Sequence, residues 1–288
     1  MTLLNKSQTN RLLGYPADAR LLIINADDLG MCHAINEATF RTLKEGVVRS
    51  TSLMVPCPWA LHAMHLLGEN PDIAFGVHLT VICDTTNYSW GPLTPKEKVP
   101  SLIDEAGYFY SLERMAELLA QARVDELEVE FRAQIEAVLA ARLKPTHLDW
   151  HCLHSGGRAD IFDMTLRLAQ EYGLALRVTD RPLIEKLQSQ GLPTDEYDLL
   201  DSYRLDTVDK SARYVQILRE LPLGLSEWAV HPGLGNAELQ AIEPTSWQVR
   251  QTDFDFLTSQ EAQAIVNEEG IILLDYRPLQ AVWTWTNF

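Results

Sequence analysis

The stretch LLIINADDLG at residues 21–30 decides how the chain begins to fold. Its four leading apolar residues predict a buried strand, and two adjacent carboxylates, Asp27 and Asp28, follow where that strand is expected to stop. Gly30 allows a sharp turn into the next helix. Neighbouring side chains on an extended chain diverge, so one carboxylate can bind a metal ion while the other acts as a base. Because Asp is also frequent in turns and at helix N-caps, the pair alone does not separate a chemical role from a structural one.

Working outward from this stretch, apolar strands alternate with amphipathic helices along the whole chain. The expected strands span residues 21–24, 47–55, 73–81, 146–151, 174–178, 203–205, 228–230 and 271–274. The expected helices span residues 34–45, 59–67, 111–143, 161–172, 210–219 and 259–268. About seven or eight such units, with no linker or repeat between them, predict a single α/β domain over residues 1–288. We favour an irregular, TIM-like (β/α) barrel over an open doubly wound sheet, with residues 1–18 as an extended N-terminal arm.

Composition and charge restrict the class of protein. The 288 residues are 46% hydrophobic, and 40 acidic against 24 basic residues give a formal net charge of −16. Such a charge argues against nucleic acid, anionic membranes and polyanionic substrates as partners. The four cysteines are scattered without a C-x-x-C pair, which is typical of reduced thiols. Neither a signal peptide nor a membrane span is evident, so we expect a cytoplasmic protein.

Several of the predicted strands end in side chains that can bind a metal ion or move a proton. The carboxyl ends of parallel strands in a (β/α) barrel meet at one face, where active sites are built, so these side chains are expected to converge. A single histidine is more often a core residue than a ligand, but independent core histidines would not all fall at strand ends. The side chains are those of Asp27 and Asp28, His78, His147, Asp149 and His151, and His231.

The segment HLDWH at residues 147–151 is the densest of these groups. Strand alternation places His147, Asp149 and His151 on one face. A carboxylate and two neutral imidazoles with open positions suit a divalent ion whose other ligands are water and substrate. Such an ion polarises a substrate carbonyl and lowers the pKa of bound water, while a free carboxylate takes the proton. The pattern therefore predicts a metal-dependent hydrolase.

The ordered motifs NADDLG, GVHL, PTHLDWH and the late HPG resemble those of the YdjC-like carbohydrate deacetylases, which include chitooligosaccharide deacetylases. The resemblance extends over most of the chain and implies a barrel-like α/β fold. It also implies an enzyme that removes N-acetyl groups from amino sugars and depends on a divalent metal ion. It implies that Asp28, His78 and His151 are the metal ligands and Asp27 the general base. It also makes His231 a candidate acid or oxyanion stabiliser.

Three further residues have expected supporting roles. Arg177, in the Leu-Arg segment that matches the family, is expected to orient a carboxylate or to bind substrate. His147 and Asp149 are expected to support the site rather than to bind the ion, since metal-binding imidazoles need an acceptor behind them. The chain departs from the family after His151, where further closely spaced histidines are usual and Cys152 stands instead. On an alternating strand the Cys152 side chain would point away from His151, which argues against Cys152 as a ligand.

Two alternatives stay open at this point. The same ion, water and base also serve a phosphoesterase or an amidase for substrates other than sugars, because fold analogy does not define the acyl group. A non-catalytic sugar-binding or regulatory protein could keep the barrel and alter the pocket. The donor set accommodates magnesium, zinc or manganese and does not choose among them. The resemblance implies a homodimer and a small acetylated sugar as the binding partner.

Overall fold

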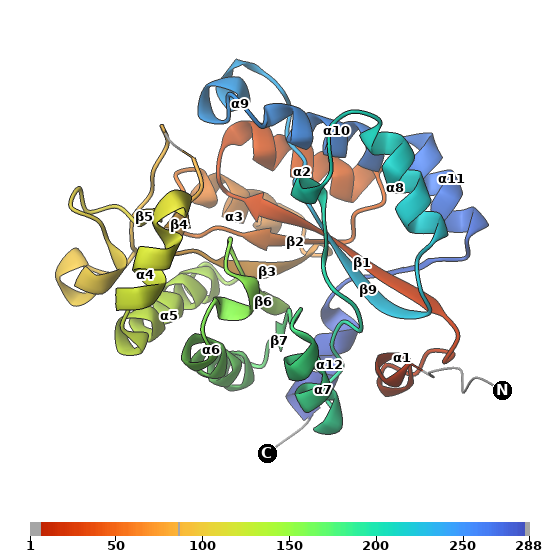
Figure 1. The fold of residues 1–288 in the computed structure, drawn as a ribbon, viewed down its shortest axis with the longest axis horizontal. Helices are drawn as coiled ribbons and strands as arrows, with labels where there is room; N and C mark the ends of the chain where they lie inside the picture. Colours follow the sequence, from red (N-terminus) through yellow and green to blue (C-terminus); the bar gives the residue numbers. More distant parts are fainter. Residues whose placement is uncertain (1–6, 86, 286–288) are drawn as a thin grey trace.

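The computed structural model describes residues 7–85 and 87–285. Its centre is a parallel sheet of eight strands, curled like part of a barrel with helices outside it (Figure 1). The strands are β1 (Arg20–Leu29), β2 (Ser50–Leu53), β3 (Ala74–Leu79), β6 (His147–Trp150), β7 (Ala175–Leu176), β8 (Leu200–Asp201), β9 (Gly224–Val230) and β10 (Ile272–Leu274). Their order is β7-β6-β3-β2-β1-β9-β8, and β10 pairs with the first half of β1 beside β2.

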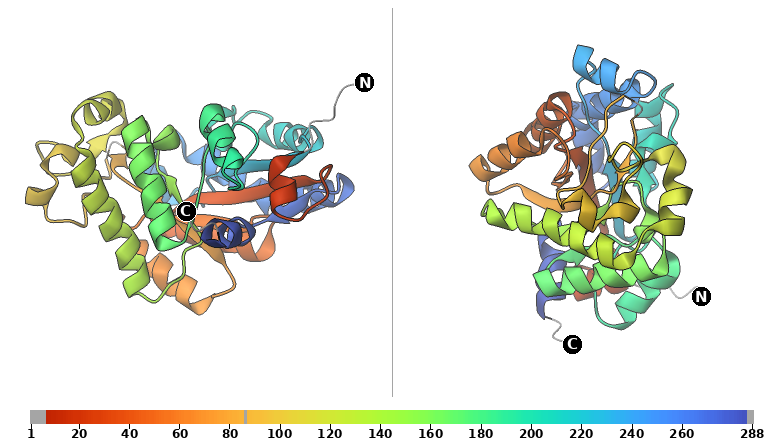
Figure 2. Two further views of the ribbon diagram at one scale, coloured as in Figure 1. Left: turned by 90° about the horizontal axis from the view of Figure 1, so that it is seen from below. Right: turned by 90° about the vertical axis from the view of Figure 1, so that its left-hand side faces the viewer.

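Helices follow most of these strands and cover the outer face of the sheet. Figure 2 shows the two long helices α5 (Val124–Ala140) and α6 (Ala159–Tyr172) side by side, where Arg132 of α5 pairs with Glu171 of α6 at 2.7 Å. The other helices are α1 (Gln8–Leu12), α2 (His33–Glu45), α3 (Ala60–Glu69), α4 (Met115–Gln121), α7 (Arg181–Ser189), α8 (Lys210–Arg219), α9 (Ala237–Ile242), α10 (Trp247–Leu257), α11 (Gln260–Glu268) and α12 (Arg277–Trp285). A separate pair of short strands, β4 (Ile82–Cys83) and β5 (Tyr110–Ser111), begins and ends the long loop between β3 and α4.

The predicted fold class, an irregular (β/α) barrel of about seven or eight parallel strands, is confirmed. In the described part of the chain no ladder joins β7 to β8, so the sheet is incompletely closed there. The single helix predicted over residues 111–143 is wrong in detail, because a short break separates α4 from α5. The strand predicted at 203–205 lies earlier, at β8, and a 3₁₀ turn follows it.

Strand β1 is the centre of the hydrophobic core. Its side chains alternate between two faces, and all four leading apolar residues are fully buried. Leu21 and Ile23 pack into one apolar cluster, whereas Leu22 and Ile24 pack into a second cluster with α8, α10 and α11. The sheet is therefore covered on both faces, as an all-parallel sheet must be.

The end of β1 departs from regular strand geometry at the two acids. The strand continues through Leu29 instead of stopping before Asp27, and its register with β2 shifts between Ala26 and Leu29. Asp28 has a φ of 68°, a left-handed conformation that is uncommon for residues other than glycine. This irregularity breaks the alternation of side chains, so that Asp27 and Asp28 both reach the same cleft.

The expected N-terminal arm, residues 1–18, lies partly outside the described residues. From residue 7 onward it contains α1, whose Thr9 is buried and donates a hydrogen bond to the Thr194 carbonyl at 2.7 Å. The described part therefore begins with a short packed helix, Gln8–Leu12, and continues in turns up to β1. Among the described helices, each is too short or too polar to cross a membrane.

Candidate active site

A cleft of about 410 Å³ opens at the carboxyl ends of the central strands. This is the size of a small-molecule site, and it lies at the face of a (β/α) barrel where ligands bind. Its lining combines acids, histidines and apolar side chains that come from seven or more separate chain segments. Among the lining residues are Asp27, Asp28, His78, Asp84, Trp150, His151, Cys152, Leu153, Arg177, Leu199, Tyr203, Arg204, His231 and Glu243.

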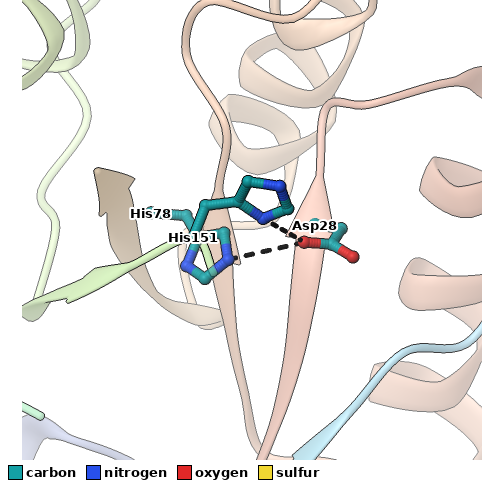
Figure 3. Close-up of side chains that lie close together, drawn as sticks. All are labelled: Asp28, His78 and His151. Carbon is teal, nitrogen blue, oxygen red and sulfur yellow. Dashed lines mark ion pairs between the residues drawn. The ribbon is translucent and has the colours of Figure 1, made fainter. Parts of the chain in front are cut away.

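Asp28, His78 and His151 meet at the floor of this cleft, although they come from three different strand ends (Figure 3). Asp28 Oδ1 lies 3.4 Å from His78 Nε2 and 3.2 Å from His151 Nδ1. Bonds of about 2.0–2.2 Å to a tetrahedral ion would place its donor atoms roughly 3.3–3.6 Å apart. The three side chains are almost fully buried, and Asp28 Oδ1 lies from each histidine nitrogen at about the separation expected for two ligands of one ion.

The two oxygens of Asp28 have different surroundings. Oδ2 accepts a hydrogen bond from Arg250 Nη2 at 2.8 Å, whereas the buried Oδ1 has no hydrogen-bond partner. Burial opposes ionisation of Asp28, but Arg250 and the two histidines outweigh it and hold the pKa well below its usual range. A buried, ionised oxygen without a partner is costly, and a cation bound at Oδ1 would remove that cost.

His78 is oriented from behind by Asp149. Its Nδ1 lies 2.8 Å from Asp149 Oδ1, and nearby Arg177 and His78 hold the pKa of the Asp149 carboxyl well below its usual range despite burial. Asp149 is therefore an acceptor, His78 donates from Nδ1, and its Nε2 is left to face Asp28. Burial alone would lower the pKa of His78, but Asp149 raises it to about 9.

Arg177 holds Asp27. Orienting a carboxylate was one of the two roles expected for this arginine, the other being to bind substrate. Nη1 and Nη2 of Arg177 donate to the two carboxylate oxygens at 2.8 and 2.9 Å, and Asn25 Nδ2 donates to Oδ1 at 2.6 Å. Arg177 also donates to Glu227 Oε1 at 2.8 Å. Burial would raise the pKa of Asp27, yet the Arg177 charge lowers it below its usual range. Asp27 is therefore an ionised carboxylate of fixed orientation beside the three candidate ligands.

A second set of donor atoms, from Asp27, His78 and Asp149, also lies within 4.8 Å of one another. This set suits a cation poorly, because the Arg177 guanidinium already occupies it and lies 3.1 Å from Asp149 Oδ2. A metal ion there would face a fixed positive charge at short range. The set of Asp28, His78 and His151 is the better metal centre of the two.

His231 follows β9 and lies at the wall of the cleft, half-buried. Its Nδ1 is 2.9 Å from Ser202 Oγ, and its backbone N–H donates to Asp253 Oδ2 at 2.8 Å. Lys210, also buried, pairs with Asp253 at 2.7 Å. A chain of buried polar contacts therefore fixes this histidine, which is available to a ligand in the cleft.

His147 does not line the cleft. Its ring stacks on Tyr276 with a centroid distance of 3.7 Å, and its Nε2 is 3.7 Å from Asp149 Oδ2. Gly76 makes room for the ring, because a Cβ there would lie 2.5 Å from His147 Nε2. His147 thus lies beneath the site, behind Asp149, and its supporting role stays a prediction.

Several residues at the site were missed by sequence reasoning. Arg250 belongs to α10, a helix that was not predicted, and one arginine in an otherwise mixed helix gives no distinct signal. Glu243 accepts hydrogen bonds from Arg250 Nε at 2.6 Å and from the Tyr203 hydroxyl at 2.9 Å. Asp84 lies in the long loop that was expected on the substrate side, but nothing in its local pattern marks it. Only the loop length pointed to this segment.

Comparisons with known proteins find relatives that align over most of the chain. The model of a family described as YdjC-like protein matches residues 21–268. A carbohydrate deacetylase of Thermoanaerobacter pseudethanolicus is 30% identical over 262 residues, which cover 91% of this chain and 100% of that protein. A carbohydrate deacetylase of Enterococcus faecalis is 33% identical over 268 residues, which cover 90% of this chain and 97% of that protein.

A solved structure is similar in both sequence and fold. It is a protein of Enterococcus faecalis V583, provisionally described as a cellobiose-phosphate cleavage protein, with 30% identity and a TM-score of 0.76. The alignment covers 91% of this chain and 99% of that one. The arrangement of the sheet and helices is therefore shared over nearly the whole length of both chains.

Proposed function

Since the chain belongs to the YdjC-like protein family, we propose that it is a divalent-metal-dependent hydrolase that removes N-acetyl groups from amino sugars or short oligosaccharides. The observation that carries the proposal is the pair of neighbouring acids at the end of β1. Asp28 leaves a buried Oδ1 without a partner between two imidazoles, while Asp27 beside it is ionised and fixed by Arg177. Curated relatives that span nearly their full length in the alignment are carbohydrate deacetylases.

Asp28, His78 and His151 would hold the ion. When bound, the ion would polarise the acetyl carbonyl and lower the pKa of a water molecule, which makes hydrolysis feasible at neutral pH. The oxygen and imidazole donors accommodate magnesium or zinc, and we propose one of these as the cofactor. Asp149 fixes the His78 ring through Nδ1, so that Nε2 faces Asp28 and would bind the ion once its own proton is displaced.

Asp27 would act as the general base. It takes a proton from the attacking water as the water oxygen adds to the acetyl carbonyl carbon, giving a tetrahedral adduct of the substrate. Its low pKa makes it a weak base but keeps it ionised, and Arg177 keeps it in one orientation. His231 would then donate a proton to the leaving nitrogen as the C–N bond breaks, which releases acetate and the free amino sugar.

The cleft fits a neutral or cationic sugar better than an anionic one. Asp84, Asp201 and Glu243 add to the acidic lining, and the guanidinium of Arg177 is already bound by Asp27, Asp149 and Glu227. Of the described lining arginines, this leaves Arg204 at the rim, where it lies 3.8 Å from Asp201. A phosphorylated sugar would meet mostly like charge. Location in the cytoplasm and assembly into a homodimer stay predictions.

A phosphoesterase or a non-sugar amidase is the rival enzyme, and a sugar-binding protein without activity is the rival from another class. The description of the related structure as a cellobiose-phosphate cleavage protein makes phosphorylated sugars worth including in the test. A protein that only binds sugar has no need of an ionised carboxylate fixed beside a metal centre. The Asp27–Arg177 pair therefore favours an enzyme.

The test is release of acetate from N-acetylglucosamine, short chitooligosaccharides, phosphorylated counterparts and acetylated non-sugar amides, with Mg²⁺ or Zn²⁺ added. We expect metal-dependent release from an unphosphorylated sugar, and at least about 100-fold less from the Asp27→Asn protein. Release of phosphate without acetate would support the phosphoesterase instead. Sugar binding by calorimetry, with no product from any substrate, would support the non-catalytic protein.

A further inference from the structure

The imidazole of His151 faces two different sets of donor atoms with its two nitrogens. Nδ1 lies 3.2 Å from Asp28 Oδ1, within the metal centre described above. Nε2, on the other side of the ring, lies 3.4 Å from Cys152 Sγ and 3.5 Å from Asp84 Oδ1. The donor atoms of Asp84, His151 and Cys152 all lie within 4.8 Å of one another.

The backbone at Cys152 explains why its thiol is there. The sequence alone predicts that this side chain points away from His151, and that prediction is wrong. Cys152 has a φ of 60°, in the left-handed region, so the alternation of β6 ends at this residue. The thiol therefore turns back toward His151 and lines the cleft. Cys152 is exposed, whereas Cys32, Cys57 and Cys83 are buried.

Asp84 supplies the second observation that points to a ligand. It follows β4 in the long loop, and its Oδ1 is buried without a hydrogen-bond partner. A contact between Cys152 and His151 alone would leave this carboxylate oxygen unpaired. Together, the orphan oxygen, the thiol and the outer imidazole nitrogen form a group with three donor types that bind cations.

We propose that Asp84, Cys152 and Nε2 of His151 form a second cation site, specific for a thiophilic divalent ion such as Zn²⁺ or Cd²⁺. Bonds of about 2.0–2.3 Å to a tetrahedral ion place donor atoms roughly 3.3–3.8 Å apart, and the separations of 3.4 and 3.5 Å from His151 Nε2 to Cys152 Sγ and Asp84 Oδ1 fall in this range. A thiolate ligand selects such ions over Mg²⁺, whereas Asp28, His78 and Nδ1 of His151 offer no sulfur. Binding would displace the thiol proton of Cys152, and when Nδ1 of His151 also holds an ion the remaining ring proton would leave as well, so that His151 would serve both ions as an imidazolate.

The site shares only His151 with the proposed hydrolytic centre and does not rest on the proposed function. It goes beyond that function by giving the cleft a second, chemically different ion position. Because Asp84 and Cys152 both line the cleft, an ion there would lie beside any bound sugar.

The test is a titration with Cd²⁺ of protein that a chelator has freed of metal ions. The signal monitored is the ultraviolet charge-transfer absorption of the Cd–thiolate bond. We expect one equivalent of this absorption in the natural protein and its loss in Cys152→Ser. Asp84→Asn should raise the Cd²⁺ concentration at the titration midpoint by about 10-fold, because the amide removes an anionic donor. The matched control is Cys32→Ser at the N-cap of α2, where serine is a favoured residue, and its absorption should equal that of the natural protein.

A third variant separates this site from the hydrolytic centre. His78→Asn should lose one of two bound equivalents, counted by equilibrium dialysis, while the thiolate absorption persists. If the absorption disappears in His78→Asn, Cys152 is a ligand of the same ion as Asp28 and the second site is refuted. Absorption that survives Cys152→Ser, or is absent from the natural protein, refutes it as well. Failure of acetate release with intact thiolate absorption would reject only the proposed function.

Discussion

Asp27 and Asp28 are neighbours in the chain, are equally buried and line the same cleft, yet the protein treats their carboxylates in opposite ways. Both oxygens of Asp27 accept hydrogen bonds from Arg177. Only one oxygen of Asp28 is bound, by Arg250, and the other faces two imidazoles without a hydrogen bond. The contacts with two different arginines therefore distinguish two acids that sequence alone cannot tell apart.

The comparison shows how a buried carboxylate is assigned to one kind of chemistry. A bidentate guanidinium satisfies and orients an acid but also repels a cation, so Asp27 is suited to proton transfer and not to metal binding. A single contact from Arg250 anchors Asp28 while leaving one oxygen free for an ion. The role that we propose for each acid rests on the contacts of its oxygens and not on its position in the motif.

Substitution of each acid by its amide tests most directly whether the two carboxylates differ in role. Asp28→Asn should abolish measurable metal binding at the hydrolytic centre, because the amide removes the anionic donor between His78 and His151. Asp27→Asn should bind metal within a few-fold of the natural protein yet lose at least about 100-fold in turnover. Calorimetric titration with Mg²⁺ or Zn²⁺, alongside acetate release, measures both effects.

Circular dichroism of both amide variants provides the control for folding. Equal loss of metal from the two proteins would make Asp27 a ligand and remove the distinction between the acids. Retained turnover in Asp27→Asn would remove it from the base role.

Arg177→Lys tests the Asp27 side of the comparison. Lysine keeps the positive charge but cannot form the two parallel hydrogen bonds, so Asp27 loses its fixed orientation. We expect kcat to fall by about 10- to 100-fold with KM nearly unchanged, because the effect is on positioning. Steady-state kinetics of acetate release separates the two constants. A rise in KM alone would show instead that Arg177 binds substrate, the other role expected for it.

Arg250→Lys tests the Asp28 side and should have a smaller effect. The lysine retains a charge near Asp28 but loses the simultaneous contacts with Asp28 and Glu243 that the guanidinium makes at 2.8 and 2.6 Å. Residues that orient metal ligands contribute about 10- to 100-fold to metal affinity. Because lysine keeps the charge, we expect Arg250→Lys to lower metal affinity by about 10-fold. Metal affinity by calorimetry is the readout. Unchanged affinity would mean that Asp28 needs no anchor.

The strand pattern was largely predictable because burial imposes it. Residues 21–24 are uniformly apolar since β1 is covered on both faces, and the polar residues at strand ends converge because the sheet is parallel. The meeting of Asp28, His78 and His151 was therefore within reach of sequence reasoning. Their roles in catalysis stay predictions.

The features that escaped prediction depend on backbone irregularities and long-range contacts. Left-handed φ values at Asp28 and Cys152 change the side-chain directions that strand alternation would otherwise fix. Glycine is the residue that usually indicates such a conformation in a sequence, and neither position is a glycine. Arg250 is separated from Asp28 by more than two hundred residues, and no local pattern encodes that contact. Sequence periodicity specifies the elements but not these individual placements.

A last expected effect, on stability and not on activity, concerns Asp195, whose neighbour Glu227 accepts a hydrogen bond from Arg177. It is buried, and burial and the nearby Glu227 charge raise its pKa well above the usual range. In the folded protein Asp195 therefore keeps its proton at pH values where the unfolded chain has lost it. Stability from this group is complete below an unfolded pKa of about 3.9 and is lost as pH rises toward the folded value.

Asp195→Asn resembles the protonated acid and should remove this pH dependence. Between about pH 5 and 8, the free energy of unfolding of the natural protein should fall relative to that of the variant by up to about 1.4 kcal/mol per pH unit. Urea denaturation at several pH values measures the difference, which cancels the contributions of other groups. Parallel curves would mean that Asp195 is ionised when folded. The negative charge of Asp195 would then also attract the nearby Arg177 guanidinium and so weaken its pairing with Asp27.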